Sequence, residues 1–498
     1  MLRGNNRLMR ETDKLNAKSK VIYGLLWKFM ERGGTQGIQF IVQIVLARIL
    51  SPNDYGVIAL IAIFISIASV FVQSGFSTAL IQKRDSDEMD FSSVFYLSLI
   101  VSSLLYGILF FTAPRIADFY DAKQLIPIIR VLSVTLFLGA INSIQNAVIS
   151  KNMQFKKLFF SSLGSMLVSG TIGIIFAYSG FGVWALVAQQ LTNQFMITVI
   201  LWFTVKWRPK LIFSFKRIKG LFSYGWKLLL SSLIDMLYMN LRSLIVGKIY
   251  SASTLGFYNR GDQFPQIIVT NINGSIQSVM LPALASEQDN RQKVKDMVRR
   301  SIVTSSFVLF PMMVGLAVIA EPLVKILLTD KWLPSVPFLQ IFCASYALWP
   351  IHTANLQAIN ALGRSDIFLK LEIIKKVLGV IILVISIHYG VYGIAVGTLL
   401  SGIISTFINA YPNLTLLNYS YKEQWKDITP SILLSLIMGA IVYNVKWLHM
   451  KPGITVILQI FFGGFIYILM ANIFKLECYT YLLATFRDIF KSRTGGTK

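Results

Sequence analysis

Residues 56–81 read GVIALIAIFISIASVFVQSGFSTALI, a run of 26 residues without a charged side chain. A helix needs about 20 apolar residues to cross the hydrocarbon core of a bilayer, so this run is long enough to span a membrane. Similar runs recur along the 498 residues and predict an all-α polytopic membrane protein with about fourteen transmembrane helices. The predicted helices cover residues 21–49, 56–81, 92–113, 125–149, 158–178, 182–205, 220–247, 262–286, 300–320, 335–362, 367–388, 390–417, 428–447 and 453–474.

The composition agrees with this fold class. Hydrophobic residues make up 55% of the chain, charged residues only 14%, and the mean hydropathy is +0.62. A soluble chain carries roughly a quarter charged residues. Two cysteines stand far apart and three histidines are isolated, which predicts neither a disulfide framework nor a metal site. The first 20 residues are polar and basic, so we expect no cleaved signal peptide.

The distribution of positive charge predicts the orientation. The formal net charge is +24, from 47 Lys and Arg against 23 Asp and Glu. With the N-terminus in the cytoplasm, 31 Lys and Arg fall on the cytoplasmic side, 9 on the opposite side and 7 within helices. Basic residues concentrate on the cytoplasmic side of membrane proteins, so we expect both termini there. Because these residues are scattered over short segments, a nucleic-acid partner is not expected.

The second half of the chain repeats features of the first. The segment 48–56 after the first helix resembles the segment 248–256 after the seventh, and Asn142 aligns with Asn355. Six helices per repeat give both halves the same orientation, as in parallel transporter repeats. The predicted parts are a cytoplasmic segment 1–20, an N-lobe 21–205, a basic cytoplasmic linker 206–219, a C-lobe 220–417, two extra helices within 428–474 and a cytoplasmic tail 475–498.

Polar side chains form stripes on the leading helices of both predicted lobes. A charge at the bilayer centre costs at least about 2.5–3.5 kcal/mol, so these stripes cannot face lipid. They either join neighbouring helices or line a water-filled cavity between the lobes, and we expect the cavity because both leading helices carry a stripe in register. The candidate substrate-binding residues are Lys28, Arg32, Gln36, Gln39, Lys227, Asp235, Arg242, Arg260 and Asn273.

The charges of these candidates favour an anionic substrate. Guanidinium groups match phosphate oxygens in a forked geometry. Asp235 and Glu31 are the candidates for ion coupling, although a structural ion pair is the favoured role for each. The linker 206–219 is expected to meet anionic lipid headgroups, each charge adding about 1 kcal/mol. The charged residues within 370–376 are expected to be a solvated start of the eleventh helix.

The sequence contains no motif for nucleotide binding, metal binding or catalysis. The best candidate for a P-loop, Gly220 to Gly225, is followed by Trp226 rather than by Lys and Ser or Thr, so no nucleotide site is expected. No His, Cys and carboxylate cluster has metal-ligand spacing, and no nucleophile stands with a base. We therefore expect a transporter rather than an enzyme, with no catalytic residues and no cofactor.

Several loop segments are similar to those of a known family. They are ARILSPNDYG at 47–56, QSGFSTALIQ at 73–82, LGFYNRGDQ at 255–263 and VMLPALA at 279–285. The chain resembles the lipopolysaccharide, colanic-acid and teichuronic-acid exporter branch (O-antigen flippase type) of the multidrug/oligosaccharidyl-lipid/polysaccharide flippase superfamily. This resemblance implies a V-shaped transporter of two six-helix lobes that works by alternating access in the bacterial cytoplasmic (inner) membrane.

The same resemblance implies the substrate and partners. The substrate would be an undecaprenyl-diphosphate-linked oligosaccharide, flipped from the cytoplasmic to the outer leaflet, and the expected partners are membrane lipids, a polysaccharide polymerase and export machinery. A multidrug/cation antiporter of the superfamily is one alternative, although it should favour an acidic cavity. A lipid II-type flippase is another, and a membrane-embedded glycosyltransferase is disfavoured because the longest loops have only about 15 residues.

Overall fold

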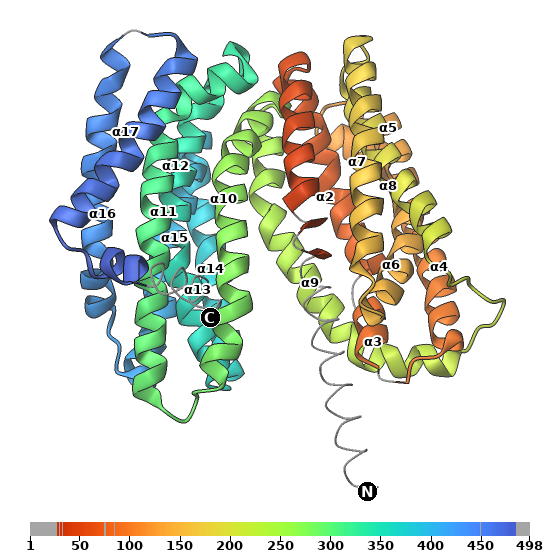
Figure 1. The fold of residues 1–498 in the computed structure, drawn as a ribbon. Coiled ribbons are helices and arrows are strands. Elements are labelled where there is room, and N and C mark those ends of the chain that lie inside the picture. Colours follow the sequence, from red (N-terminus) through yellow and green to blue (C-terminus); the bar gives the residue numbers. More distant parts are fainter. Residues whose placement is uncertain are drawn as a thin grey trace, which may run out of the picture. The chain divides into compact units, whose positions relative to one another are not determined.

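The computed structural model describes residues 27–28, 30–31, 33–73, 76–83, 85–448 and 450–484. All regular secondary structure within these ranges is helical, which confirms the predicted fold class (Figure 1). The chain forms two compact units, Met1–Gly256 and Phe257–Lys498, and each is described by itself below.

The first unit contains residues 33–49, which are helical, and eight further helices. They are α2 (Pro52–Gln73), α3 (Phe76–Gln82), α4 (Glu88–Phe119), α5 (Leu125–Leu132), α6 (Thr135–Lys151), α7 (Phe155–Tyr178), α8 (Val183–Thr204) and α9 (Phe215–Ile249). Helix α10 (Ala252–Ala285) begins in this unit and continues into the second. Because α9 packs on α2, α3 and α4, it belongs to the first compact unit, whereas the lobe boundary at 206–219 remains a prediction.

The second unit continues with one long helix and a series of shorter ones. They are α11 (Arg291–Leu328), η1 (Asp330–Ser335), α12 (Val336–Ala347), α13 (Trp349–Ala361), α14 (Ser365–Ser386), η2 (Ile387–Tyr389), α15 (Gly390–Leu417), α16 (Tyr421–Tyr443), η3 (Asn444–Leu448) and α17 (Pro452–Ile473).

The predicted spans overlap these helices wherever the structure describes them, but 125–149 is divided into α5 and α6, and 335–362 into α12 and α13. Eleven helical stretches in the described part of the chain are long and apolar enough to cross a membrane. One of them, Ser365–Leu417, joins α14 to α15, yet the chain turns at Gly390 with a φ of +80°. The number of fourteen crossings stays a prediction.

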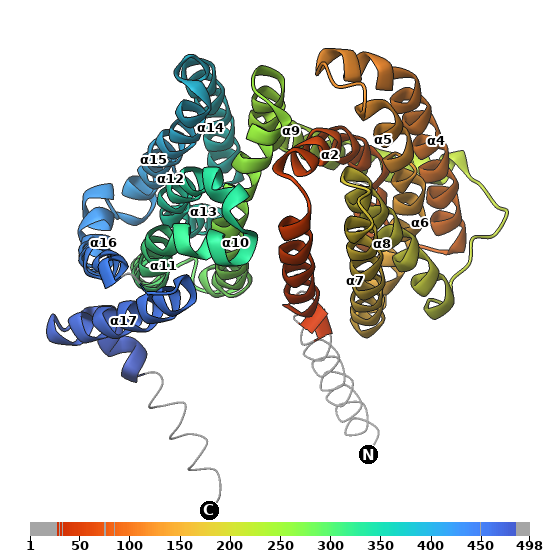
Figure 2. The ribbon, with the colours of Figure 1, turned by 90° about the horizontal axis from the view of Figure 1, so that it is seen from above.

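Two antiparallel hairpins show how the sequence sets the packing. The turn between α7 and α8 contains Gly180 and Gly182, both at positive φ, which glycine adopts without a steric penalty. Further along the pair, Asn193 donates to the Ser169 hydroxyl at 3.3 Å. The second hairpin joins α14 and α15, whose helices also lie side by side (Figures 1 and 2). Short connections of this kind keep consecutive helices antiparallel.

A buried amide contact recurs at matching positions of the two units. In the first, Asn142 of α6 donates to the Gln194 side chain of α8 at 3.2 Å. In the second, the Asn413 side chain of α15 donates to Asn355 Oδ1 of α13 at 2.7 Å. Asn142 and Asn355 are the residues that the sequence repeat aligns, so this contact supports the repeat. Each amide joins the fourth and sixth predicted helices of its half.

Helices α16 and α17 pack against α11 in the second unit (Figure 2). Phe307, Met438 and Tyr467 belong to the shared apolar core, and the Tyr467 hydroxyl donates to the backbone oxygen of Phe307 at 3.0 Å. The two last predicted helices therefore cover one face of the long helix α11.

The starts of α2 and α10 approach each other closely. A Cβ atom at Gly56 would overlap the carbonyl oxygen of Ala252, and a Cβ atom at Gly256 would overlap that of Pro52. Only glycine allows two backbones to come so near. These two glycines end the repeated segments 48–56 and 248–256, so the repeat places them against each other's helix start.

We predict that Gly56→Ala lowers the melting temperature of the purified protein, because overpacking a tight contact costs about 1–3 kcal/mol. Gly107→Ala in α4 is the matched control, since nothing lies within 4 Å of its Cβ position. Differential scanning fluorimetry in detergent compares the two. Equal melting temperatures for both variants would contradict the close approach.

Candidate functional site

The described part of the first predicted stripe contains an ion pair. Lys28 Nζ lies 3.0 Å from Glu31 Oε2, and the Ser162 hydroxyl of α7 donates to Glu31 Oε1 at 3.3 Å. Gln36 is half-buried and Gln39 is exposed. Arg32 lies outside the described residues. Glu31 thus has the contacts of a structural ion pair. Its part in ion coupling remains a prediction.

Helix α9 presents the second predicted stripe. Lys227 and Asp235 are exposed and Arg242 is half-buried. The Arg242 guanidinium lies 5.7 Å from the centroid of the Tyr238 ring, a cation–π contact within the helix. Asp235 lies ten residues into the candidate span Gly225–Ile249, about 15 Å along it at 1.5 Å per residue. A charged carboxylate at that depth would be costly against acyl chains.

The two candidates in the second unit have different surroundings. Arg260 is buried, its guanidinium lies 5.1 Å from the Trp332 ring centroid, and it donates to Gln263 Oε1 at 2.6 Å. The contact with Trp332 joins α10 to η1, whereas the hydrogen bond to Gln263 lies within α10. Asn273 is also buried, and neither its oxygen nor its nitrogen has a hydrogen-bond partner among the described residues. A buried amide in that state needs water or a ligand, since leaving it unsatisfied costs about 1–3 kcal/mol.

One membrane-embedded pair escaped the sequence analysis. The charged residues within 370–376 were expected at a solvated helix start, but α14 begins at Ser365, so Lys375 lies ten residues inside it. Lys375 Nζ is 2.5 Å from Glu372 Oε1, and its side chain is only 13% exposed. The expectation of solvation is wrong for Lys375. The spacing of three residues between the two charges is the signal that could have revealed the pair.

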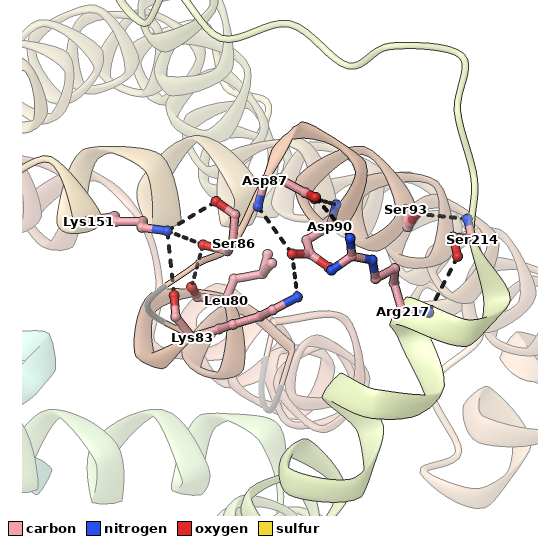
Figure 3. A network of polar contacts seen from close by, with 9 residues as sticks. All are labelled: Leu80, Lys83, Ser86, Asp87, Asp90, Ser93, Lys151, Ser214 and Arg217. Carbon is pink, nitrogen blue, oxygen red and sulfur yellow. Dashed lines mark hydrogen bonds and ion pairs between the residues drawn. The ribbon is translucent and has the colours of Figure 1, made fainter.

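A second unexpected network lies where α3, α4 and α9 meet (Figure 3). Asp90 is fully buried, and Lys83 Nζ lies 2.6 Å from its Oδ2. Asp87 and Asp90 form a capping box at the start of α4, in which each side chain accepts from the other's backbone N–H. Arg217 of α9 reaches both acids, at 3.1 Å from Asp87 and 3.8 Å from Asp90. We call Lys83, Asp87, Asp90 and Arg217 the junction cluster.

Contacts within the junction cluster lower the pKa of one of its acids. The Asp90 backbone N–H, with Arg217 and Lys83 as lesser contributors, holds the pKa of the Asp87 carboxyl below its ordinary value. Asp87 is therefore an anionic cap at the positive end of the α4 dipole, a favourable position.

Two serine hydroxyl groups of α4 accept hydrogen bonds from the backbone of the linker, next to the junction cluster. The Lys210 backbone N–H donates to Ser92 Oγ at 3.1 Å, and the Ser214 N–H donates to Ser93 Oγ at 3.0 Å (Figure 3). On the other side of the cluster, Lys151 Nζ donates to the Ser86 backbone oxygen at 3.2 Å. The segment before α9 is thus fixed along α4.

Comparison with known proteins decides the family. The sequence profile described as "Polysaccharide biosynthesis protein" matches residues 45–337, more than half of the chain. The chain belongs to this family. The resemblance found in the sequence is confirmed, and Cys343 and Cys478 are buried free cysteines, in agreement with the absence of a disulfide framework.

Curated relatives of this polysaccharide biosynthesis family protein are named for the biosynthesis of cell-surface polysaccharides. The chain is 26% identical over 302 residues to the teichuronic acid biosynthesis protein TuaB of Bacillus subtilis (strain 168), covering 60% of this chain and 62% of that one. It is 23% identical over 426 residues to the lipopolysaccharide biosynthesis protein WzxC of Escherichia coli (strain K12), covering 85% and 87%. It thus spans less than two thirds of TuaB but most of WzxC.

Solved structures confirm the fold. The lipid II flippase MurJ in an inward closed conformation is similar with a TM-score of 0.75 and 16% identity, over 92% of this chain and all 100% of that one. An inward-facing multidrug resistance MATE family transporter is similar with a TM-score of 0.58 and 16% identity, over 77% and 94%. Both are described by names of transporters, and at these identities the similarity concerns the fold alone.

We predict that Asp90→Asn destabilises the protein strongly. Asp90 is fully buried while Lys83 and Arg217 are 31% and 41% exposed, so the variant loses charge-assisted contacts of about 1.5–3 kcal/mol each without leaving a buried cation unpaired. Glu88→Gln is the matched control two residues away, since Glu88 pairs with Lys210 where both side chains are more than half exposed, and exposed pairs contribute about 0–1 kcal/mol. Melting temperature and membrane yield report the difference. Equal losses in both variants would show that the Asp90 pair is not important for stability.

Proposed function

We propose that this protein is a flippase that moves an undecaprenyl-diphosphate-linked oligosaccharide from the inner to the outer leaflet of the cytoplasmic membrane. Membership of the polysaccharide biosynthesis family supports the proposal, as do the relatives named for teichuronic acid and lipopolysaccharide biosynthesis. A fold similar to a lipid II flippase suits a cargo that pairs a polar headgroup with a hydrocarbon tail.

The structural observation that carries the proposal is the exposed polar face of α9. Lys227 and Asp235 are exposed within a helix that is long and apolar enough to span the membrane. Since hydrocarbon cannot solvate such charges, this face lies along a water-filled space. A headgroup passing through that space meets side chains that can replace its hydration, while a lipid tail stays in the membrane.

The preference for a diphosphate follows from the cations on this face. Arg242 stacks over Tyr238, and this contact leaves the N–H groups at the edge of its guanidinium plane free to bind phosphate oxygens. Lys227 lies on the same helix and adds a second positive charge. A multidrug transporter of cationic compounds, the alternative that the MATE fold raises, would be disfavoured by these charges. A lipid II-type flippase would bind a diphosphate by the same contacts but would carry a different glycan.

Alternating access would use two parallel lobes of six helices, and the recurring amide contacts of Asn142 and Asn355 support that repeat. The proposal also includes cytoplasmic termini, an energy source in an ion gradient with Asp235 or Glu31 as the coupling residue, and delivery of the flipped glycan to a polysaccharide polymerase and export machinery.

The decisive experiment is to delete the gene and analyse lipid-linked glycans. We expect undecaprenyl-diphosphate oligosaccharide to accumulate, protected from a periplasmic probe, and to return to normal when the gene is restored. Unaltered glycan levels together with increased sensitivity to cationic drugs would favour the antiporter instead. Accumulation of lipid II would favour the lipid II-type flippase.

We predict that Arg242→Ala lowers polymer export at least tenfold at unchanged protein level, because a charge-assisted bond to phosphate contributes about 1.5–3 kcal/mol. Arg242→Lys should retain part of the activity, since it keeps the charge but loses the fork. Lys123→Ala, a change of equal charge in the turn between α4 and α5, is the control. Full export by Arg242→Ala would remove Arg242 from the substrate path.

Asp235→Asn tests the coupling residue. We predict that this variant transports more slowly and that its rate no longer depends on the proton or sodium gradient, because the amide cannot bind and release the ion. Flipping of a fluorescent lipid-linked oligosaccharide in proteoliposomes, with and without each gradient, measures this. An unchanged dependence on the gradient would exclude Asp235 and leave Glu31 as the candidate.

A further inference from the structure

The first two turns of α9 have two different faces. At 100° per residue, Phe215, Ile218 and Phe222 fall on one side of the helix. Lys216 and Arg217 fall on the opposite side, directly after Ser214, which caps the helix. Each side borders its own cavity in the first unit, one polar and one apolar.

The polar cavity has a volume of about 830 Å³, within the usual range for ligand sites of about 300–1,000 Å³. The polar side chains that line it are Gln82, Lys83, Ser214, Lys216 and Arg217. No carboxylate lies among its lining residues. We call it the junction cavity, because Lys83 and Arg217 of the junction cluster line it together with residues at the end of α3 and the start of α9.

Two of the three cationic side chains that line the junction cavity are already held in place by ion pairs. Lys83 and Arg217 are held by the buried Asp90 and by Asp87, so little side-chain freedom remains to be lost when they bind a ligand. Lys216 is exposed and makes no ion pair within the described chain. With two acids against three cations the cavity keeps an excess positive charge, and the positive end of the α9 dipole adds to it. An anion is the ligand that this arrangement favours.

The apolar cavity indicates an amphiphile. Its volume is about 500 Å³, and Phe71, Phe76, Leu97, Val101, Phe215 and Phe222 line it. Leu97 and Val101 lie about two and a half and three and a half turns into α4, deeper along that helix than Asp87 and Asp90. Along α3, Phe76 borders the apolar cavity and Gln82 borders the junction cavity. The polar region is therefore at the helix ends and the apolar region deeper, as headgroups and chains are arranged in a leaflet.

Exposed apolar side chains place the same segment in the membrane interface. Leu211 is 95% exposed and Phe215 is 73% exposed. Side chains of this kind, next to Lys210 and Lys216, are typical of segments that lie in the plane of the headgroups, with apolar groups in the acyl region. A water-soluble anion would leave the exposed apolar side chains without a function, whereas a lipid accounts for both these side chains and the cationic cavity.

We propose that the junction cavity binds the phosphate headgroup of an anionic glycerophospholipid, with its acyl chains against the apolar side of α9. Lys83, Lys216 and Arg217 would bind the phosphate oxygens, and Gln82 and Ser214 the neighbouring polar groups. This lipid site lies apart from the polar stripe proposed for transport, and it would anchor the start of α9 at the membrane surface. A polyprenyl diphosphate offers the same phosphate chemistry, so the test separates the two sources.

The test uses the full chain in detergent and native mass spectrometry. Phosphatidylglycerol is titrated, and binding of the first lipid is compared among wild type, Lys216→Gln and Lys219→Gln. Lys219 is the matched control, because it is exposed on the same two turns but borders the apolar cavity. We expect Lys216→Gln to weaken the first binding step roughly fivefold and Lys219→Gln to leave it unchanged. Equal effects of the two variants would overturn the proposal in favour of unspecific surface attraction.

Two competitors identify the source of the phosphate. Excess phosphatidylcholine and millimolar inorganic phosphate should not displace the first phosphatidylglycerol. Displacement by inorganic phosphate would show a site for a soluble anion, and displacement by undecaprenyl phosphates at lower concentration than phosphatidylglycerol would assign the cavity to the polyprenyl carrier. Either result would overturn the glycerophospholipid assignment, and neither would bear on export, which is measured separately.

Discussion

The structure depends on one constraint: hydrocarbon solvates neither a bare charge nor an unpaired backbone group. Helices satisfy their own backbones, so the described chain is built from them. Charged side chains are then left with three options. They pair inside the protein, as Lys375 does with Glu372; they lie at helix ends, as Asp87 and Arg217 do; or they face water, as we propose for the polar face of α9.

Ion-pair networks at helix ends recur in the two units. In the first, the capping box of Asp87 and Asp90 receives cations from two other elements. In the second, Ser420 and Glu423 form a capping box at the start of α16, and Lys295 of α11 lies 3.4 Å from Glu423. Arg299, one turn further along α11, binds Asp427 and Glu477 at 3.0 and 2.7 Å. Both units thus join helix starts to distant segments through charges outside the hydrocarbon.

One set of charged residues therefore holds the helices together, and another is available for the proposed contact with substrate. The network residues are paired and fixed, which makes them suited to hold the linker and the helix ends in place. The polar face of α9 is exposed along its span, which makes it suited to contact a moving headgroup. The same helix therefore begins in a fixed junction, at Arg217, and continues as the polar face that we propose for transport, which includes the exposed Asp235.

The sequence predicted the positions of most helices, because an apolar run of spanning length has few other stable structures. It also identified Asn142 and Asn355 as equivalent, and the structure gives both the same kind of contact. Site residues were harder to predict. Lys28 and Glu31 turned out to pair within one helix, and Arg260 fastens α10 to Trp332, because a stripe on a helical wheel does not say what packs against it.

The amino-acid sequence by itself determined that this chain is a bundle of membrane helices, since hydropathy and helix length are local properties. Its loop segments also carried the family resemblance. Only the tertiary structure decided which charges meet. Asp90 is buried against Lys83 and Arg217, residues 7 and 127 positions away, and no periodicity links them. Which distant segments come together follows from how the helices pack, and that packing created the junction cavity.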